Sequence, residues 1–200
     1  MTIALVLLDL QKGILLSDRI KWEDSATPGK VLVAAERLLT SARAAGRTII
    51  HVGVVRPLAR GTFDALRTAN AQKSGRAPRD VLALSGGTED VEFALTPATG
   101  EETVYKIGVS AFQGTRLDGL LRNAEIRDVV VAGAFTHMVV ESTVRQGFDL
   151  GYRMIVVEDA CCSPAAGPHN TALTIGLPNF ATIVTSAEAA ALFERGPRAG

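Results

Sequence analysis

The sequence predicts a three-layer α/β/α domain, in which a mostly parallel sheet lies between two layers of helices. Apolar runs of strand length alternate with segments of helical periodicity along the chain. The first run has no polar alternation, as in a strand covered on both faces. The chain has 200 residues, 47% of them hydrophobic, and no linker, repeat or low-complexity run divides it. We therefore expect residues 1–200 to form a single domain.

The first half of the chain supplies two strands and a long helix. Residues 3–8 form the first apolar run, so Asp9 stands at the carboxyl end of the first strand. Apolar residues recur at helical spacing over residues 29–45, and Gly46 is a natural stop for that helix. Residues 48–55 read as a second strand. The next 45 residues or so are irregular and rich in proline and glycine, which is typical of a lid or a binding loop.

The second half repeats the alternation of strands and helices. Strands are predicted at residues 103–106, 128–132, 153–157 and 181–184, and the first of them ends in Lys106. Helices are predicted at residues 115–121, 136–148, 168–175 and 187–195, with Thr136 as the N-cap of the second. Strands that alternate with helices imply right-handed crossovers and hence a parallel sheet.

Composition limits the classes of partner and the compartment. The 21 basic and 21 acidic residues leave no net charge to attract nucleic acid or an anionic membrane, so we expect a small molecule or a protein as partner. The N-terminal apolar run is too short for a membrane span and lacks the basic flank of a signal peptide. The two cysteines, Cys161 and Cys162, are adjacent and poorly placed for a structural disulfide. These features favour a reducing, cytoplasmic setting.

Three chemically useful positions follow predicted strands, where ligands bind in open parallel sheets. They are Asp9, Lys106 and the turn at residues 133–139. An ammonium group beside a carboxylate favours the ionised acid, which can then shuttle a proton. A solvated or structural salt bridge is an equally good interpretation of the spacing. No glycine-rich phosphate loop occurs, so the sequence gives little support for nucleotide binding.

Four segments carry a family resemblance. They are VLLDLQ at residues 6–11, YKIGVSAFQGTRLDGLL at 105–121, VVVAGAFTHMVVESTVRQGFDLGYRMIVVEDACCS at 129–163, and the closing ATIVTSAEA. In this order they resemble the isochorismatase-like hydrolase superfamily, which holds nicotinamidases, N-carbamoylsarcosine amidases and isochorismatases. The resemblance implies a six-stranded, Rossmann-like parallel sheet and, in the amidase branch, an Asp-Lys-Cys triad. Asp9 matches the acid and Lys106 matches the lysine.

The family's cysteine has no counterpart at the matching position of this chain. Its G-x-x-T-x-x-C pattern, placed on Gly133 and Thr136, puts Val139 where the nucleophile would be. An isopropyl group cannot form an acyl intermediate. Cys161 and Cys162 match a D-A-C stretch that is not the family's nucleophile, and we expect both to be buried, inert thiols.

The resemblance also implies a particular turn after the fourth strand. A cis peptide is expected at Ala134-Phe135, with the amides of Phe135 and Val139 directed at an oxyanion. Isochorismatases carry an A-H-x-G pattern here and hydrolyse an enol ether without a covalent intermediate. His137 matches that histidine. The first helical turn lowers the pKa of a histidine, so His137 could donate to a substrate oxygen as a neutral ring, or it could cap the helix.

Further residues are expected to shape the pocket. Gln11 is close enough in sequence to orient Asp9. Arg56 and Arg60 are candidates to clamp a substrate carboxylate, with ordinary surface arginines as the alternative. Three aromatic residues are candidate pocket walls, although core packing suits the last of them better: Trp22, Phe63 and Phe112.

No metal or other cofactor is expected. The family's nicotinamidases bind a metal through an Asp-x-His pair, and this chain reads HVGV at residues 51–54 without the acid. We expect His51 and His169 to be structural.

Three hypotheses for function follow. The first is a hydrolase that acts on a small, carboxylated metabolite, in which Asp9 is the acid or base and water replaces the thiolate. The second is a pseudoenzyme that binds a ligand or a protein without turnover. The third is an amidase that uses Cys162, which requires that sulfur within hydrogen-bond reach of Asp9. The resemblance also implies a homodimer or a homotetramer.

Overall fold

The computed structural model describes residues 2–18, 20–23, 27–55 and 91–195, and within them it contains a six-stranded sheet. The strands lie in the order β3-β2-β1-β4-β5-β6, and every neighbouring pair is parallel. Their bounds are β1 Ile3–Leu8, β2 Thr48–Val54, β3 Glu102–Lys106, β4 Asp128–Ala134, β5 Arg153–Cys162 and β6 Ala181–Val184. The predicted α/β fold with a six-stranded, mostly parallel sheet is therefore confirmed.

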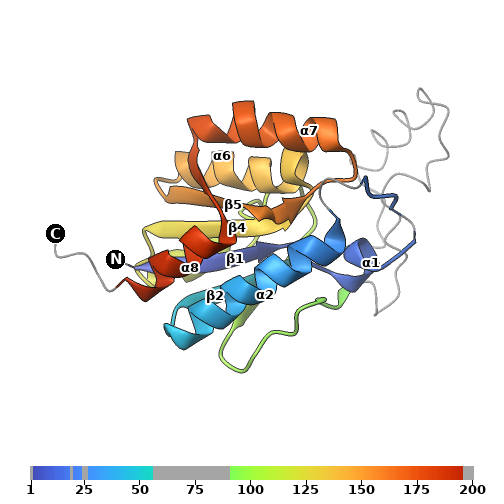
Figure 1. The fold of residues 1–200 in the computed structure, drawn as a ribbon. Coiled ribbons are helices and arrows are strands. Elements are labelled where there is room, and N and C mark those ends of the chain that lie inside the picture. Colours follow the sequence, from blue (N-terminus) through green and yellow to red (C-terminus); the bar gives the residue numbers. More distant parts are fainter. Residues whose placement is uncertain (1, 19, 24–26, 56–90, 196–200) are drawn as a thin grey trace.

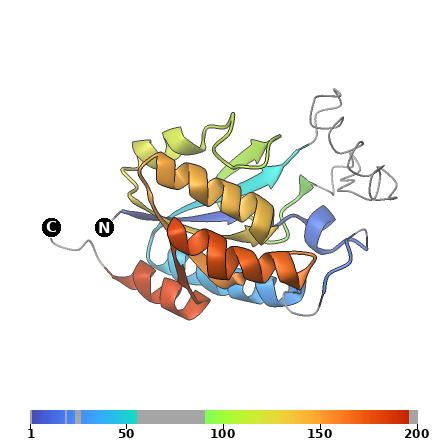
Figure 2. The same cartoon turned by 90° about the horizontal axis from the view of Figure 1, so that it is seen from above.

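Helices cover both faces of this sheet (Figures 1 and 2). On one face lie α2 (Pro28–Ala44) and α8 (Ser186–Glu194), and on the other lie α6 (Glu141–Asp149) and α7 (Ala166–Thr171). Two further helices are α1 (Lys12–Leu15) and α5 (Leu117–Asn123). The central strand β1 is buried along its whole length, as its unbroken apolar sequence predicts. Among the described residues no helix combines the length and the apolar character needed to cross a membrane.

The helix α2 shows how the sequence pattern determines burial. Six of its residues are buried, and they are the apolar positions with helical spacing: Val31, Ala34, Ala35, Leu38, Leu39 and Ala42. Pro28 suits the first turn because an N–H there would have no partner in the helix. Gly46 follows the helix with a φ of 61°, which a residue without a Cβ adopts readily.

The predicted helix at residues 136–148 differs at its start. A π-helical turn, η3 (Thr136–Val140), precedes α6. Phe135 is the N-cap and makes no side-chain capping bond, so the prediction of Thr136 as the N-cap was wrong. The Thr136 hydroxyl instead hydrogen-bonds Nδ1 of the buried His169 at 2.9 Å, which supports a structural role for that histidine.

Candidate active site

The carboxyl ends of β1 and β4 meet at the point where the strand order reverses. These strands are neighbours, with Leu8 opposite Gly133, and chain connections leave them in opposite directions across the sheet. Ligands of open α/β sheets bind at such a point. Asp9 follows β1 with a φ of 54°, and Phe135 follows β4 with a φ of 61°. Left-handed backbone is uncommon outside glycine and concentrates at functional sites.

Asp9 and Lys106 form a buried ion pair at this edge. Lys106 ends β3, which is separated from β1 by β2, so its side chain reaches past one strand to meet Asp9. Its Nζ donates to Oδ2 of Asp9 at 2.8 Å and to the carbonyl of Gly108 at 3.2 Å. Both residues are only 2% exposed. The other carboxylate oxygen, Oδ1 of Asp9, has no hydrogen-bond partner in the part of the chain that the structure describes.

Burial decides the protonation behaviour of this pair. It raises the pKa of Asp9 above the usual value, because a charged carboxylate loses its hydration there, and the positive charge and hydrogen bond of Lys106 oppose that rise. An ammonium group has three donors, and two of those of Lys106 are used by Asp9 and Gly108. The pair thus combines an acid of raised pKa, one unpaired oxygen and a cation with a third donor.

Gln11 does not orient Asp9, contrary to the prediction. Its amide accepts from the Val54 N–H at 2.7 Å and donates to the carbonyls of Val54 and Val91, both at 3.1 Å. These contacts join the end of β1 to the end of β2. They also join it to Val91, the residue at which the described part of the chain resumes. Gln11 therefore links the ends of β1 and β2 and makes no hydrogen bond to Asp9.

The turn after β4 differs from the prediction in two respects. No cis peptide occurs among the described residues, so the bond at Ala134-Phe135 is trans. The Val139 N–H donates to the Phe135 carbonyl at 2.8 Å, as does the Met138 N–H at 2.9 Å. The Val139 amide is therefore engaged within the helix start and is not available for an oxyanion. The Phe135 N–H faces Cys162. Burial raises the pKa of the Cys162 thiol, and the hydrogen bond from the Phe135 N–H partly offsets that rise.

His137 and Trp22 lie near this turn. Nδ1 of His137 hydrogen-bonds Oγ of the buried Ser163 at 2.9 Å. The pKa of His137 is lowered, in the predicted direction, with burial as the cause and Glu141 opposing it. Ser163 was missed by the sequence reasoning, because the predicted strand ended at residue 157 and β5 in fact runs to Cys162. The Trp22 ring lies 6.0 Å from the Phe135 ring, centroid to centroid.

Comparison with known proteins places this chain in a family. The isochorismatase domain matches residues 3–188. The chain belongs to the isochorismatase family. A relative from Bacillus subtilis (strain 168), the uncharacterized isochorismatase family protein YwoC, is 31% identical over 191 residues and covers 92% of this chain and 90% of its own. The ureidoacrylate amidohydrolase RutB of Caulobacter vibrioides is 35% identical over 155 residues, covering 72% of this chain and 68% of its own.

Solved structures agree with the sequence matches. An isochorismatase family protein from Burkholderia thailandensis superposes with a TM-score of 0.76 at 26% identity, covering 97% of this chain and 96% of the other. The N-carbamoylsarcosine amidase of Thermoplasma acidophilum, at 24% identity and a TM-score of 0.69, covers 93% and 97% and shares the fold. The solved structures therefore support the isochorismatase-like fold that the sequence predicts.

The two cysteines of this isochorismatase-family chain are buried, as expected. Burial raises the pKa of the Cys161 thiol to about 12 and also raises that of Cys162, so thiolate is scarce at neutral pH. Of the two Asp9 oxygens, one pairs with Lys106 and the other has no partner within the described residues, so Cys162 makes no hydrogen bond to Asp9. The requirement for an amidase that uses Cys162 is not met.

The remaining candidates lie outside the ion-pair region or outside the described residues. His51 is a buried histidine, as predicted, and its Nε2 lies 2.8 Å from Oε2 of Glu101. Phe112 packs in the core and stacks on Tyr152, which confirms the preference for packing. Within the described ranges, no group of three His, Cys, Asp or Glu side chains could hold a metal ion. Arg56, Arg60 and Phe63 lie outside the described residues.

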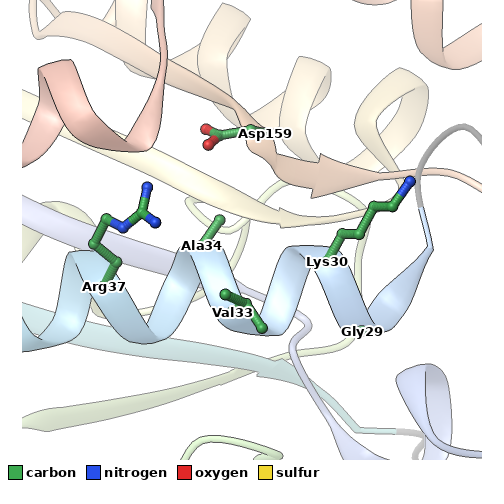
Figure 3. A pocket seen from close by; sticks show the side chains of 6 residues that line it. All are labelled: Gly29, Lys30, Val33, Ala34, Arg37 and Asp159. Atoms are coloured by element: carbon green, nitrogen blue, oxygen red, sulfur yellow. The ribbon is translucent and has the colours of Figure 1, made fainter.

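An open groove of about 390 Å³ lies between α2 and β5 (Figure 3). No residue that the sequence predicts for the active site lines this groove. The lining residues are Gly29, Lys30, Val33, Ala34, Arg37 and Asp159. The Asp159 carboxylate accepts from the Ser186 N–H and hydroxyl at 2.7 and 2.6 Å. Arg37 donates to the same hydroxyl at 3.2 Å. These polar groups hold α2, β5 and α8 together.

Proposed function

We propose that this isochorismatase-family protein hydrolyses a small, carboxylated metabolite by direct attack of water, without a covalent enzyme intermediate. The observation that carries the proposal is the buried Asp9-Lys106 pair with its unpaired Oδ1. It is combined with the prediction that Val139 stands at the position of the family's nucleophile. A carboxylate oxygen without a protein partner can hold a water molecule or a substrate proton. Its burial makes each such interaction stronger than it would be in bulk water.

The chemistry assigns a separate task to each group. The Asp9 carboxylate takes a proton from water as the oxygen attacks the electrophilic carbon, and it returns that proton to the leaving oxygen or nitrogen. Its raised pKa makes both transfers easier near neutral pH. Lys106 holds the carboxylate in place, and its third N–H can donate to the oxygen that gains negative charge. Val139 provides no nucleophile, so the reaction involves no thioester.

The substrate class follows from the relatives and from the expected binding residues. RutB proteins are named as ureidoacrylate amidohydrolases, so an amide or ureido bond in a carboxylated compound is one candidate. An enol ether, which needs only an acid and water, is the other. In this proposal His137 donates to the substrate, Phe135 and Trp22 line its apolar side, and Arg56 and Arg60 bind its carboxylate.

A substrate screen on wild type and Asp9→Asn tests this function. The panel contains isochorismate, nicotinamide, ureidoacrylate and N-carbamoyl amino acids. We expect Asp9→Asn to lower kcat by at least about 100-fold, because general acid-base catalysis contributes about 10² to 10⁴. Asp18→Asn, an exposed carboxylate in the same connection after β1, should leave kcat unchanged. Equal turnover by wild type and Asp9→Asn would refute the mechanism.

A second candidate is a protein that binds such a ligand without hydrolysing it. The specific observation in its favour is the Val139 N–H, which is engaged by the Phe135 carbonyl at 2.8 Å. Loss of both the thiol and an oxyanion donor would leave binding intact and catalysis weak. Saturable binding of a panel compound, with no product after prolonged incubation, would favour this candidate.

A further inference from the structure

Two buried side-chain atoms have no hydrogen-bond partner in the part of the chain that the structure describes. They are Oδ1 of Asp9 and Nε1 of Trp22. Both belong to the connection between β1 and α2, at the carboxyl edge of the sheet. Buried polar groups are nearly always paired, so each exception needs an explanation. The proposed function explains Asp9, but it uses Trp22 only as an apolar wall.

The protein holds Trp22 at this edge from two sides. Its ring contacts that of Phe135, the first residue after β4, with the ring planes inclined by 37°. The next residue, Glu23, donates its N–H to the carbonyl of Pro164 at 3.0 Å, and Pro164 lies just beyond β5. The indole is thereby fixed beside the ends of β4 and β5. Phe135 packing alone would be served equally well by a phenyl ring, which has no polar atom to bury.

Polar side chains on neighbouring segments are already paired with one another. The Ser163 hydroxyl is paired with Nδ1 of His137, and the Thr136 hydroxyl with Nδ1 of His169, both at 2.9 Å. An indole N–H can only donate, so its partner must be an acceptor. None of the described residues accepts from the indole N–H, so this position is open to an acceptor oxygen of a ligand.

We propose that the Trp22 indole N–H is a specificity-determining hydrogen-bond donor, and that the ligand of this site carries a carbonyl or carboxylate oxygen to accept from it. The inference rests on the proposed function, since it concerns the same site, and it deepens it by naming a group that the ligand must have. Asp9 then meets the reacting end of the ligand, and Trp22 meets an acceptor oxygen of the same molecule. Compounds without such an oxygen bind more weakly.

The single tryptophan makes the inference directly measurable. An ¹⁵N-labelled full-length chain gives one indole N–H resonance, whose proton shift moves downfield when the N–H gains an acceptor. The probes are N-carbamoylglycine, nicotinamide and isochorismate, each with an acceptor oxygen. We expect at least one of them to move the resonance downfield in a saturable way. A resonance that none of them moves at millimolar concentration overturns the inference.

Guanidinoacetate is the matched probe for N-carbamoylglycine. It keeps the carboxylate and replaces the urea oxygen by nitrogen. A downfield shift with N-carbamoylglycine alone assigns the urea oxygen as the acceptor, and a shift with both assigns the carboxylate. Each of these results supports the donor role of Trp22.

The Trp22→Phe substitution tests how much the indole N–H contributes to the affinity for the ligand. It keeps a ring against Phe135 and removes only the donor and the second ring. We expect calorimetry to give about five- to tenfold weaker binding of the probe that moved the resonance, the range for loss of one net hydrogen bond. Tyr152→Phe, which removes an aromatic donor that pairs with Asp118, should leave the affinity unchanged. Equal affinity of wild type and Trp22→Phe overturns the inference.

These readouts do not depend on turnover. A protein that binds a probe through Trp22 but hydrolyses nothing refutes the proposed function and supports the inference. A protein that hydrolyses a substrate through Asp9, and whose Trp22→Phe variant binds the probe with unchanged affinity, supports the proposed function and refutes the inference.

Discussion

Val139 is predicted to occupy the position of the nucleophilic cysteine in the family's amidases. It lies in the π-helical turn η3 after β4, its side chain is buried, and its carbonyl accepts from the Thr143 hydroxyl at 2.7 Å. Cysteine is slightly smaller than valine, so a thiol fits here without displacing its neighbours. The start of a helix favours the thiolate form. A restored cysteine would therefore show whether the surroundings of the nucleophile persist.

We expect Val139→Cys to react with iodoacetamide faster than the native protein does. The native thiols are buried and their pKa values are raised, so folded wild type should be alkylated slowly. Intact-mass measurements over time give the rate, and the expected product carries one added group. Wild type is the control for Cys161 and Cys162. Alkylation of the variant at the wild-type rate would show that position 139 is closed to reagents.

The sequence alone was sufficient to predict the Asp9-Lys106 ion pair, but not the hydrogen bonds made by the residues around it. Asp9 and Lys106 follow apolar strands, and the carboxyl ends of parallel strands share one edge, so their meeting could be predicted. The role of Gln11 could not, because its amide pairs with backbone groups of β2 that come near only in the folded sheet. The engagement of the Val139 N–H also depends on a backbone feature, the left-handed Phe135, that no residue pattern indicates.

At the scale of secondary structure elements, the close approach of β4 to β1 depends on Gly133. A Cβ at this position would lie 2.2 Å from the Leu8 carbonyl oxygen and 2.7 Å from the Leu8 side chain. Its φ of 153° is also one that other residues rarely adopt. The glycine therefore lets the two strands that carry Asp9 and Phe135 pack at the distance the site requires.

We expect Gly133→Ala to lower the free energy of unfolding by about 2 to 4 kcal/mol, since overpacking costs about 1 to 3 kcal/mol and backbone strain adds to it. Urea denaturation measures the change. Gly119→Ala is the matched control, because a Cβ there has nothing within 4 Å and the residue lies inside α5. That substitution should stabilise by up to about 1 kcal/mol. Equal effects of both substitutions would contradict the role assigned to Gly133.

Element boundaries were predicted well where apolar periodicity is continuous and poorly where polar residues interrupt it. The helix over residues 29–45 was correct to within a residue at each end. The strand β5 runs to Cys162, five residues beyond the predicted end at Val157. Glu158 and Asp159 break the apolar run, yet Asp159 stays in the strand and binds the start of α8 through Ser186. A contact so distant in sequence leaves no periodic signal.

At the scale of the whole molecule, a second charged cluster, which is partly buried, lies apart from the candidate site. Glu101 accepts from Arg43 at 2.6 Å and from the Ala98 N–H at 2.9 Å, and it pairs with His51 at 2.8 Å. These contacts join α2, β2 and the segment before β3.

The homodimer or homotetramer and the cytoplasmic setting remain predictions. Light scattering on the purified chain measures the former.

The cluster predicts how stability changes in acid. Burial alone would raise the pKa of Glu101, but the hydrogen bonds from Arg43, Ala98 and His51, together with the Arg43 charge, lower it to about 2. A folded pKa below the unfolded value of 4.5 means that the unfolded chain binds the proton first. The contribution of Glu101 is therefore present above pH 4.5 and is lost as the pH falls toward 2. Burial also lowers the pKa of His51 below 6.5, which adds a loss of the same sign at higher pH.

We expect Glu101→Gln to be less stable than wild type at pH 7, with a difference that shrinks as the pH falls toward 3. The glutamine keeps the size of the side chain but cannot be ionised, so it lacks the acid-sensitive contribution. Urea denaturation at several pH values measures both curves. Glu102→Gln, in an exposed pair with Arg116, should change stability little at any pH, because solvent screens such a pair. A difference between Glu101→Gln and wild type that stays constant across this range would show that Glu101 acts through packing and not through its charge.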